Sequence, residues 1–203
     1  MKNYITHDSF IELYNKDEEI FERIFGKCKL VNTFINKIQK ESKNWKKFGY
    51  NEEQGRDKMI GDLFEIFAEL FFKILGSDNR VGVYGYEVEN FDDYGVDGFG
   101  KGIDDKPCTI QAKFRTDEEK ELTIKDLHNF QGISYAKYGV DVNDSGNLII
   151  FSTTGLHWIT GERVLSGKSR IIDKEMMRTL LDSNIPFWNV VRDYVDSSVE
   201  EYY

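Results

Sequence analysis

The stretch YGVDGFGKGIDDKPCTIQAKFR, residues 94–115, reads as two short strands joined by a turn rich in glycine and aspartate. Apolar and polar residues alternate along the second strand, which is typical of a strand whose two faces meet different surroundings. Cys108 and Ile110 would lie on one face, and Gln111 and Lys113 on the other. The pattern therefore predicts a central strand that presents an amide and an ammonium group on one face.

Asp97 belongs to the first of these two strands. Side chains on the same face of neighbouring antiparallel strands approach within about 5 Å, and residues two apart along a strand lie about 7 Å apart. Asp97, Gln111 and Lys113 can therefore present a carboxylate, an amide oxygen and an ammonium group to a single point. The alternative interpretation is a strand with an ordinary polar, solvated face.

Oxygen ligands of this kind suit a hard divalent cation such as Mg²⁺, which keeps several of its waters and is held by few protein groups. Asp97 would be the main ligand, Gln111 would supply a neutral oxygen, and the Ala112 carbonyl would contribute as well. The Lys113 ammonium would act on the attacking water and on the negative charge that grows on a phosphate. This combination favours phosphodiester hydrolysis.

A long helix is predicted over residues 56–75, and its apolar residues cover so much of the cylinder that the helix should be largely buried. Asp62, Glu65 and Glu69 interrupt the apolar surface. In one interpretation, Glu65 lies against the sheet and closes the metal site as a direct or water-mediated ligand. In the other, the three carboxylates form the solvent-exposed stripe of the helix.

The order of elements over the rest of the core is helix, strand, strand, strand, helix, strand, which predicts an α/β fold with a central mixed sheet flanked by helices. Residues 1–55 show helical periodicity and are predicted to form an N-terminal helical extension, broken near Gly26. The further predicted elements are strands over 81–89 and 147–153, a helix over 123–137 that Thr123 caps, and a helix over 173–182.

Lys and Arg number 27 and Asp and Glu 36, so the net charge is 27 − 36 = −9. Such a surplus argues against a protein that coats nucleic acid or membranes without specificity, but it leaves room for a local basic groove. The two cysteines, Cys28 and Cys108, form no disulfide framework, which favours a reducing compartment. With neither an apolar leader nor a membrane-spanning stretch, we expect a cytoplasmic protein.

Three segments in this order, GDLFE (61–65), YGVDGFG (94–100) and IQAKFR (110–115), resemble the PD-(D/E)xK nuclease superfamily. More narrowly, the chain is similar to Mrr-like restriction endonuclease domains, in which G-x-x-F-E on a helix precedes a G-[VI]-D strand and a strand that ends Q-[AC]-K. The resemblance runs from about Arg56 to Gly155. It departs at Gln111, where the superfamily's general motif has an acidic residue, and at Val96, where a proline often precedes the aspartate.

The resemblance implies a restriction-endonuclease-like nuclease core over residues 56–203 and a Mg²⁺-dependent DNA endonuclease, with Mn²⁺ able to substitute. It assigns catalytic roles to Glu65, Asp97, Gln111 and Lys113. Asp97 and Gln111 would surround the metal, Lys113 would act at the water, and Glu65 would support them.

A nuclease must also hold DNA, whose phosphates attract clustered Lys and Arg. One active site cuts one strand, so we expect either a homodimer related by a two-fold axis or a place in a larger assembly. The basic residues considered for DNA binding are Lys101, Arg115, Lys46, Lys47, Arg163 and Lys168, with Lys43 and Arg170 beside them.

Two other functions stay open at this point. The chain can be a non-catalytic module of nuclease fold that acts as an interaction or assembly subunit, because a fold does not dictate a function. RNA is a weaker alternative substrate, since the chain lacks the interleaved aromatic and basic signature of common RNA-binding modules.

Overall fold

The computed structural model of the chain describes residues 4–53, 55–90, 95–117, 119–141, 145–157 and 170–201. The chain divides into two compact units. The helical unit comprises Met1–Leu70 and Met177–Tyr203, and the sheet unit comprises Phe71–Met176. The helical unit thus combines both ends of the chain, whereas the sequence predicted a division between residues 55 and 56. Helices α4 (Gly55–Leu75) and α7 (Lys174–Leu181) each run from one unit into the other.

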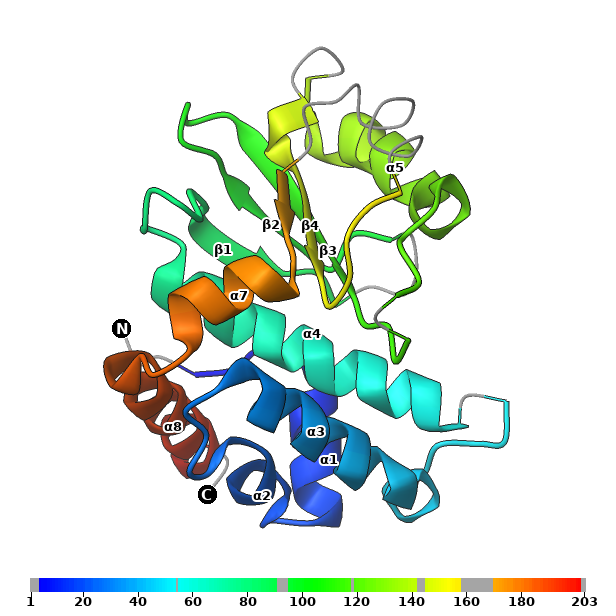
Figure 1. Cartoon of the computed structure of the whole chain (residues 1–203), viewed down its shortest axis with the longest axis vertical. Coiled ribbons are helices and arrows are strands. Elements are labelled where there is room, and N and C mark those ends of the chain that lie inside the picture. The colour runs from blue at the N-terminus through cyan, green and yellow to red at the C-terminus, as the bar shows by residue number, and fades with distance from the viewer. Residues whose placement is uncertain are drawn as a thin grey trace. The chain divides into compact units, whose positions relative to one another are not determined.

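Aromatic side chains form the core of the helical unit, whose helices are labelled in Figure 1. The ring centroids of Phe10 and Phe21 lie 4.4 Å apart, those of Phe34 and Phe67 lie 4.1 Å apart, and Phe67 stacks on Trp188. Aromatic pairs of this kind add to the stability that burial of their area already gives. The core joins α4 to the other helices of the unit, which are α1 (Asp8–Lys16), α2 (Ile20–Phe25), α3 (Val31–Glu41), the 3₁₀ helix η1 (Ser42–Phe48) and α8 (Ile185–Glu200).

The sheet unit contains a five-stranded mixed sheet in the order β1-β2-β3-β4-β5. The strands are β1 (Tyr84–Val88), β2 (Gly98–Lys101), β3 (Pro107–Lys113), β4 (Leu148–Ser152) and β5 (Arg170–Ile172). The first three strands pair antiparallel, and β3, β4 and β5 pair parallel. The predicted α/β fold with a mixed sheet flanked by helices is confirmed.

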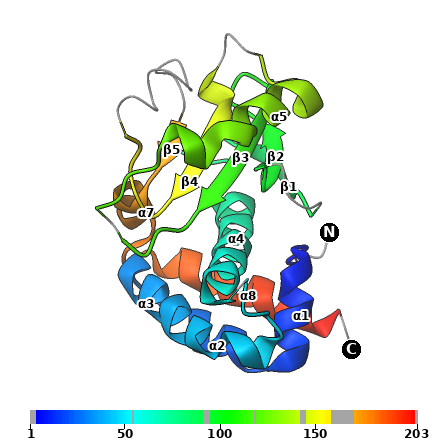
Figure 2. The same cartoon turned by 90° about the vertical axis from the view of Figure 1, so that its right-hand side faces the viewer.

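Helix α5 (His128–Tyr138) covers one face of this sheet, and the 3₁₀ helix η2 (Ile124–Leu127) leads into it (Figure 2). The predicted cap is confirmed, because Thr123 forms a capping box with Asp126. Thr109 of β3 donates a hydrogen bond to the Ser134 hydroxyl of α5 at 2.7 Å. Around this contact lies a buried apolar cluster of Val96, Leu122, Leu127, Phe130, Val140, Leu148 and Ile150.

The other face of the sheet packs against the last turn of α4. Phe151 of β4 contacts Phe71 and Phe72, with centroid distances of 4.9 and 5.5 Å. Ala112 pairs with Phe151 in the parallel register and therefore shares its face, while Thr109 lies on the α5 face. The predicted alternation of β3 is confirmed, and Gln111 and Lys113 belong to the α5 face.

The predicted elements need three corrections: two elements were missed, and one region contains more helices than predicted. Helix α8 was missed, although Asn184 caps it by accepting from the Phe187 N–H at 3.2 Å and proline stands in its first turn. Strand β5 was missed as well. The N-terminal region, predicted to form two helices, forms α1, α2 and α3, and the predicted break at Gly26 ends α2.

Within the described part of the chain, no helix is both long enough and apolar enough to cross a lipid bilayer.

Candidate metal and catalytic site

Asp97 lies directly before β2, so the prediction that placed it within a strand is corrected by one residue. Its N–H donates to the Ile110 carbonyl at 2.9 Å, and its own carbonyl accepts from the Glu89 N–H at 3.0 Å. Its Oδ2 accepts from the Ala112 N–H at 2.6 Å. Backbone and side chain are thus both fixed against β3, and the carboxylate is held beside the residue that separates Gln111 from Lys113.

Gln111 is the buried polar residue of this strand. Only 2% of it is exposed, and its Oε1 has no hydrogen-bond partner among the described residues. Buried polar atoms in native proteins nearly always have a partner, and leaving one without costs about 1–3 kcal/mol. The lone pairs of this oxygen are therefore open to a ligand, as the predicted metal site requires.

Gly95 makes room for the Gln111 amide. Its φ of +81° belongs to the left-handed region, and a Cβ built on it would lie 2.8 Å from Gln111 Nε2 and 3.4 Å from the Phe130 nitrogen. Both the conformation and the close approach require glycine. Glycine is therefore needed before Val96 and Asp97, because it lets α5 and the Gln111 amide lie close to the chain that carries Asp97.

Lys113 ends β3 and is half-buried. Its carbonyl accepts from the Thr153 N–H at 3.3 Å, and in the parallel register it pairs with Ser152 of β4. With the residues that the structure describes, its ammonium group forms neither a hydrogen bond nor an ion pair. A half-buried ammonium group without a carboxylate partner is suited to an incoming anion such as a phosphate.

The donor set fits Mg²⁺. One carboxylate, one amide oxygen with free lone pairs and neighbouring main-chain carbonyls are all hard oxygen ligands, and Mg²⁺ completes its shell with water. Over the described residues, no group of three or more His, Cys, Asp or Glu side chains is placed to hold a metal. A cation at this site would therefore depend on Asp97, on Gln111 and on the Ala112 carbonyl, with water in the other positions.

Glu65 belongs to the helical unit, where its partner is His7. The Glu65 Oε2 lies 3.0 Å from His7 Nε2, and 27% of the Glu65 side chain is exposed. The Ser9 N–H points to His7 Nδ1 at 3.3 Å, so Nε2 carries the proton that it shares with Glu65. This partner comes from the N-terminal segment of the same unit, and the expectation that Glu65 lies against the sheet stays a prediction.

The solvent-exposed stripe predicted as the alternative for this helix is wrong. Glu69 is fully buried and accepts from the Thr6 N–H and hydroxyl, each at 2.6 Å, and from the His7 N–H at 2.9 Å. Asp62 is 3% exposed and accepts from the Tyr50 hydroxyl at 2.5 Å and the Lys58 ammonium at 2.7 Å. Each carboxylate is satisfied by donors of its own unit, which is the signature of a structural role.

His7 was missed by the sequence analysis. Burial lowers the pKa of His7, but the hydrogen bond to Glu65 and the charges of Glu65, Glu69 and Asp62 outweigh burial, so the pKa is raised. Burial, followed by the charge of Asp62, likewise raises the pKa of Tyr50. The sequence around His7 reads as the start of a helix, and it carries no signal that Glu65 and Glu69 of α4 contact it.

Four of the six basic residues predicted to bind DNA already have carboxylate partners. Lys101 pairs with Asp105 at 2.8 Å and Arg115 pairs with Asp126. In the helical unit, the pairs are Lys46–Glu52 at 2.7 Å and Lys47–Asp17 at 2.5 Å. Phosphates would have to compete with these pairs. Arg163 and Lys168 lie outside the described residues.

Arg170, also considered for DNA, has a structural role instead. Its guanidinium donates to the carbonyls of Val81 at 2.8 Å, Gly82 at 3.1 Å and Gly146 at 3.1 Å. Burial lowers the pKa of Arg170. A guanidinium committed to three main-chain carbonyls has little capacity left for a phosphate.

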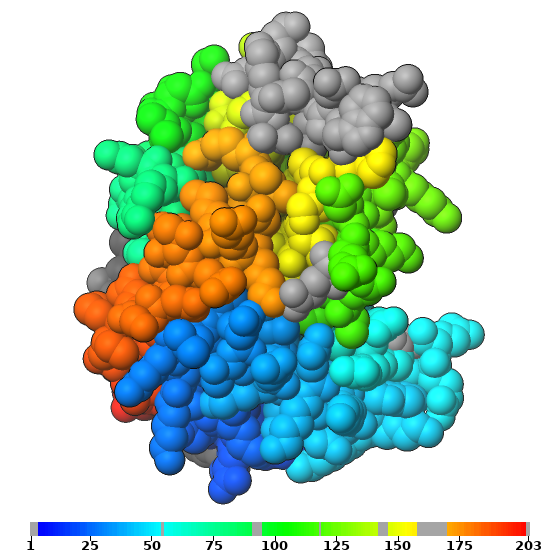
Figure 3. Space-filling view, in the orientation of Figure 1, coloured from blue at the N-terminus to red at the C-terminus, as the bar shows by residue number. Residues whose placement is uncertain are grey.

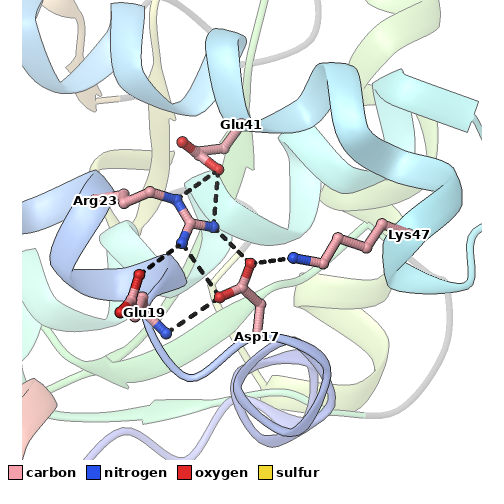
Figure 4. Close-up of polar contacts among 5 residues, drawn as sticks. All are labelled: Asp17, Glu19, Arg23, Glu41 and Lys47. Atoms are coloured by element: carbon pink, nitrogen blue, oxygen red, sulfur yellow. Dashed lines mark hydrogen bonds and ion pairs between the residues drawn. The ribbon is translucent and has the colours of Figure 1, made fainter.

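Lys47 takes part in a charged network that links the helices of the helical unit (Figure 4). Asp17, just after α1, accepts from Arg23 of α2 at 2.8 Å and from Lys47 of η1 at 2.5 Å. Arg23 also pairs with Glu41 of α3 at 3.1 Å. The hydrogen bonds from Arg23 and Lys47 hold the pKa of Asp17 well below its usual range. Lys47 therefore stabilises the helix arrangement.

The protein has an α/β fold in which the Asp97 carboxylate is hydrogen-bonded to β3, the strand that carries the buried Gln111 and ends at Lys113. A scan against known protein families found no family that matches the chain, and a search of curated proteins found no matching sequence. The functional interpretation therefore rests on the site itself and on the motif pattern.

Proposed function

We propose that the protein is a Mg²⁺-dependent DNA endonuclease that hydrolyses phosphodiester bonds. One observation carries the proposal: among the described residues the buried Gln111 Oε1 has no partner. This oxygen belongs to a strand that also binds the Asp97 carboxylate through Ala112 and ends at Lys113. An arrangement that leaves an interior oxygen unsatisfied next to a fixed carboxylate is expected where a cation binds.

Each residue has a distinct role in this proposal. The Asp97 carboxylate, preorganised by the Ala112 N–H, supplies the negative charge of the metal site. Gln111 supplies a neutral oxygen, so the site holds one negative charge fewer than a site with two acids. A bound Mg²⁺ would supply Lewis-acid activation of the phosphate and a water of lowered pKa. The Lys113 ammonium orients the attacking water and stabilises the negative charge on the phosphate oxygens.

The motif pattern supports the same assignment. The glycine, aspartate, glutamine and lysine that resemble the Mrr-like pattern are the residues gathered around β3, and the mixed sheet flanked by helices is compatible with a restriction-endonuclease-like core. In that family a helix glutamate supports the site, and Glu65 holds the matching position of this sequence, so the motif alone assigns it this role. Cleavage of both strands would require a homodimer or a larger assembly, and a reducing, cytoplasmic compartment fits the two buried free thiols.

The test is cleavage of supercoiled plasmid, modified and unmodified, in Mg²⁺ or Mn²⁺, by the wild type and by Lys113→Ala and Asp97→Asn. We expect both substitutions to lower the cleavage rate by about 10²–10⁴-fold, because each removes a group that acts at the reacting phosphate. Lys125→Ala is the matched control, since Lys125 is an exposed lysine of η2 and its loss should change the rate less than about twofold.

The same assay also has outcomes that would contradict the proposal. If wild-type protein with intact fold leaves every DNA and RNA substrate uncut in both metals, the non-catalytic module becomes the better explanation. If Lys113→Ala cuts as fast as Lys125→Ala, the nuclease activity has another origin.

A further inference from the structure

The helical unit contains a cavity that the candidate metal site does not use. It has a volume of about 320 Å³ and lies among α1, α2 and α8. Helices α2 and α8 pack against each other, and Figure 3 shows α8 and the N-terminal helices meeting at the molecular surface. The volume falls at the lower end of the range for ligand pockets, so the cavity suits one large side chain better than a whole cofactor.

The floor of the cavity is apolar. Phe21 and Phe25 of α2 and Val195 of α8 line it, and each is at most 8% exposed. The rings of Phe21 and Phe25 stack with a centroid distance of 6.2 Å, which gives the floor a flat aromatic wall. An aromatic or aliphatic side chain that enters the cavity would remove its own apolar surface from water and so gain hydrophobic free energy.

The rim of the cavity is acidic. It carries the exposed carboxylates of Glu18, Glu22, Asp196 and Glu200 against a single cation, Arg192, so four negative charges face one positive charge and the rim has a net charge of −3. Arg192 donates to the Asn189 side chain in its own helix. None of the ion pairs among the described residues includes Glu22, Asp196 or Glu200.

The neighbouring carboxylates affect the pKa of Asp196. Burial raises the pKa of Asp196, and the charges of Asp193, Glu22 and Glu200 raise it further. Like charges gathered around an apolar cavity repel one another, and an added cation would relieve this repulsion. DNA is excluded from the same surface, because its phosphates would meet the carboxylates directly.

We propose that this cavity binds a basic segment of a partner protein, with one aromatic or aliphatic side chain in the cavity and neighbouring Lys or Arg side chains on the carboxylate rim. Charge complementarity selects the cationic partner, and the apolar floor selects a segment that also carries a hydrophobic anchor. The inference does not depend on nuclease activity, since the cavity lies entirely in the helical unit.

The experiment measures fluorescence anisotropy of a fluorescein-labelled peptide, RKWKRG, with the full-length protein at 0.15 M salt, a concentration at which the Debye length is about 8 Å. We expect Asp196→Asn/Glu200→Gln to weaken peptide binding at least tenfold. The control Glu12→Gln/Glu53→Gln removes the same charge from exposed positions of the same unit, and binding should change less than twofold. The peptide RKAKRG, which lacks the anchor, should bind the wild type at least tenfold more weakly.

A third variant tests the cavity without changing charge. Val199→Trp places a bulky side chain at a lining position and should weaken RKWKRG at least tenfold while circular dichroism stays unchanged. Equal weakening by the two double variants would mean that the peptide reads only net charge, and the proposal would then be overturned. Unchanged binding by Val199→Trp and by the tryptophan-free peptide would overturn it as well.

Discussion

Glu69 in the helical unit and Gln111 in the sheet unit are both polar side chains buried to at least 98%, yet their surroundings differ completely. Glu69 accepts hydrogen bonds from two main-chain N–H groups and a hydroxyl. Gln111 Oε1 accepts none from the described residues. A charged group in the interior has therefore been given more donors than a neutral one, as its larger desolvation cost demands.

The comparison distinguishes buried polar groups that stabilise the fold from buried polar groups that are available to a ligand. A buried carboxylate with three donors is satisfied and has nothing left for a ligand, so it serves the fold. A buried amide oxygen without a donor costs stability in the free protein and becomes satisfied only when something binds. The same rule identifies Asp62 and Glu69 as structural and supports the proposed role of Gln111 as a ligand.

The largest expected effect is on Glu69. Glu69→Ala leaves the N–H groups of Thr6 and His7 and the Thr6 hydroxyl without their acceptor, and we expect the free energy of unfolding to fall by about 3 kcal/mol. Urea unfolding at pH 7 measures the loss. Glu12→Ala, at an exposed position of α1, should stay within about 0.5 kcal/mol of wild type. A loss below about 1 kcal/mol at Glu69 would contradict the structural role.

The next effect concerns metal binding. Because a ligand that binds only the folded state stabilises it, Mn²⁺ at a hundred times its dissociation constant should add about 2.7 kcal/mol, which is a rise of roughly 5–10 °C in Tm. Differential scanning calorimetry with and without Mn²⁺ measures this shift. Asp97→Asn should abolish the shift, and Glu121→Gln, exposed in the same unit, should retain it. A shift that survives in Asp97→Asn places the metal elsewhere.

Substitutions at Gln111 should move stability and metal affinity in opposite directions. Gln111→Leu removes the unsatisfied oxygen, so the metal-free protein should gain about 1 kcal/mol and lose the Mn²⁺ shift. Gln111→Glu adds a charge, so the metal-free protein should be less stable and bind Mn²⁺ at least about tenfold more tightly. Chemical unfolding and Mn²⁺ titration by electron paramagnetic resonance measure the two quantities. If the Gln111→Leu protein is less stable than wild type and still binds Mn²⁺, Gln111 stabilises the fold as Glu69 does and is not a metal ligand.

The smallest effect is the pH dependence of the charged network. Arg23 and Lys47 lower the pKa of Asp17 in the folded protein, so the contribution of Asp17 is fully present above the unfolded value of about 3.8 and is lost as the pH falls through the lower folded value. Arg23 and Lys47 are 35% and 57% exposed, so screening limits the contribution to about 0.5–1 kcal/mol. Asp17→Asn should cost that amount at pH 6, and the gap to wild type should narrow below pH 3.8 in urea unfolding. A gap that stays constant down to pH 2 would contradict this account.

The elements with strong periodicity were predictable from the sequence. The helix predicted over 56–75 is observed as Gly55–Leu75, and the alternation in β3 placed Gln111 and Lys113 on one face. Gln111 and Lys113 share a face because side chains two residues apart on one strand point to the same side. Helix α8 also had a start signal in the sequence, because Asn184 caps it and Pro186 stands in its first turn.

Partners from distant parts of the chain were not predictable. The spacing of Asp62, Glu65 and Glu69 shows that they share one side of α4, but it does not show what covers that side. Tyr50 and the segment Thr6–His7 cover that side of the helix. Thr6 and His7 are more than 50 residues away in the sequence from the carboxylates that they contact, and the sequence of this segment does not indicate where it packs. The ion pair of Lys47 with Asp17 was hidden for the same reason, whereas Lys101 and Asp105 pair within one short turn.

The guanidinium of Arg170 also sets how the sheet unit comes apart. Arg170 opens β5 at one margin of the sheet, while Val81 and Gly82 lead into β1 at the opposite margin, and Gly146 precedes β4. Detaching β5 would remove the donor of three carbonyls at once, two that lead into β1 and one that precedes β4. The outermost strands are thereby made to open in concert, so hydrogen exchange at the two margins should report one shared opening event in place of independent fraying.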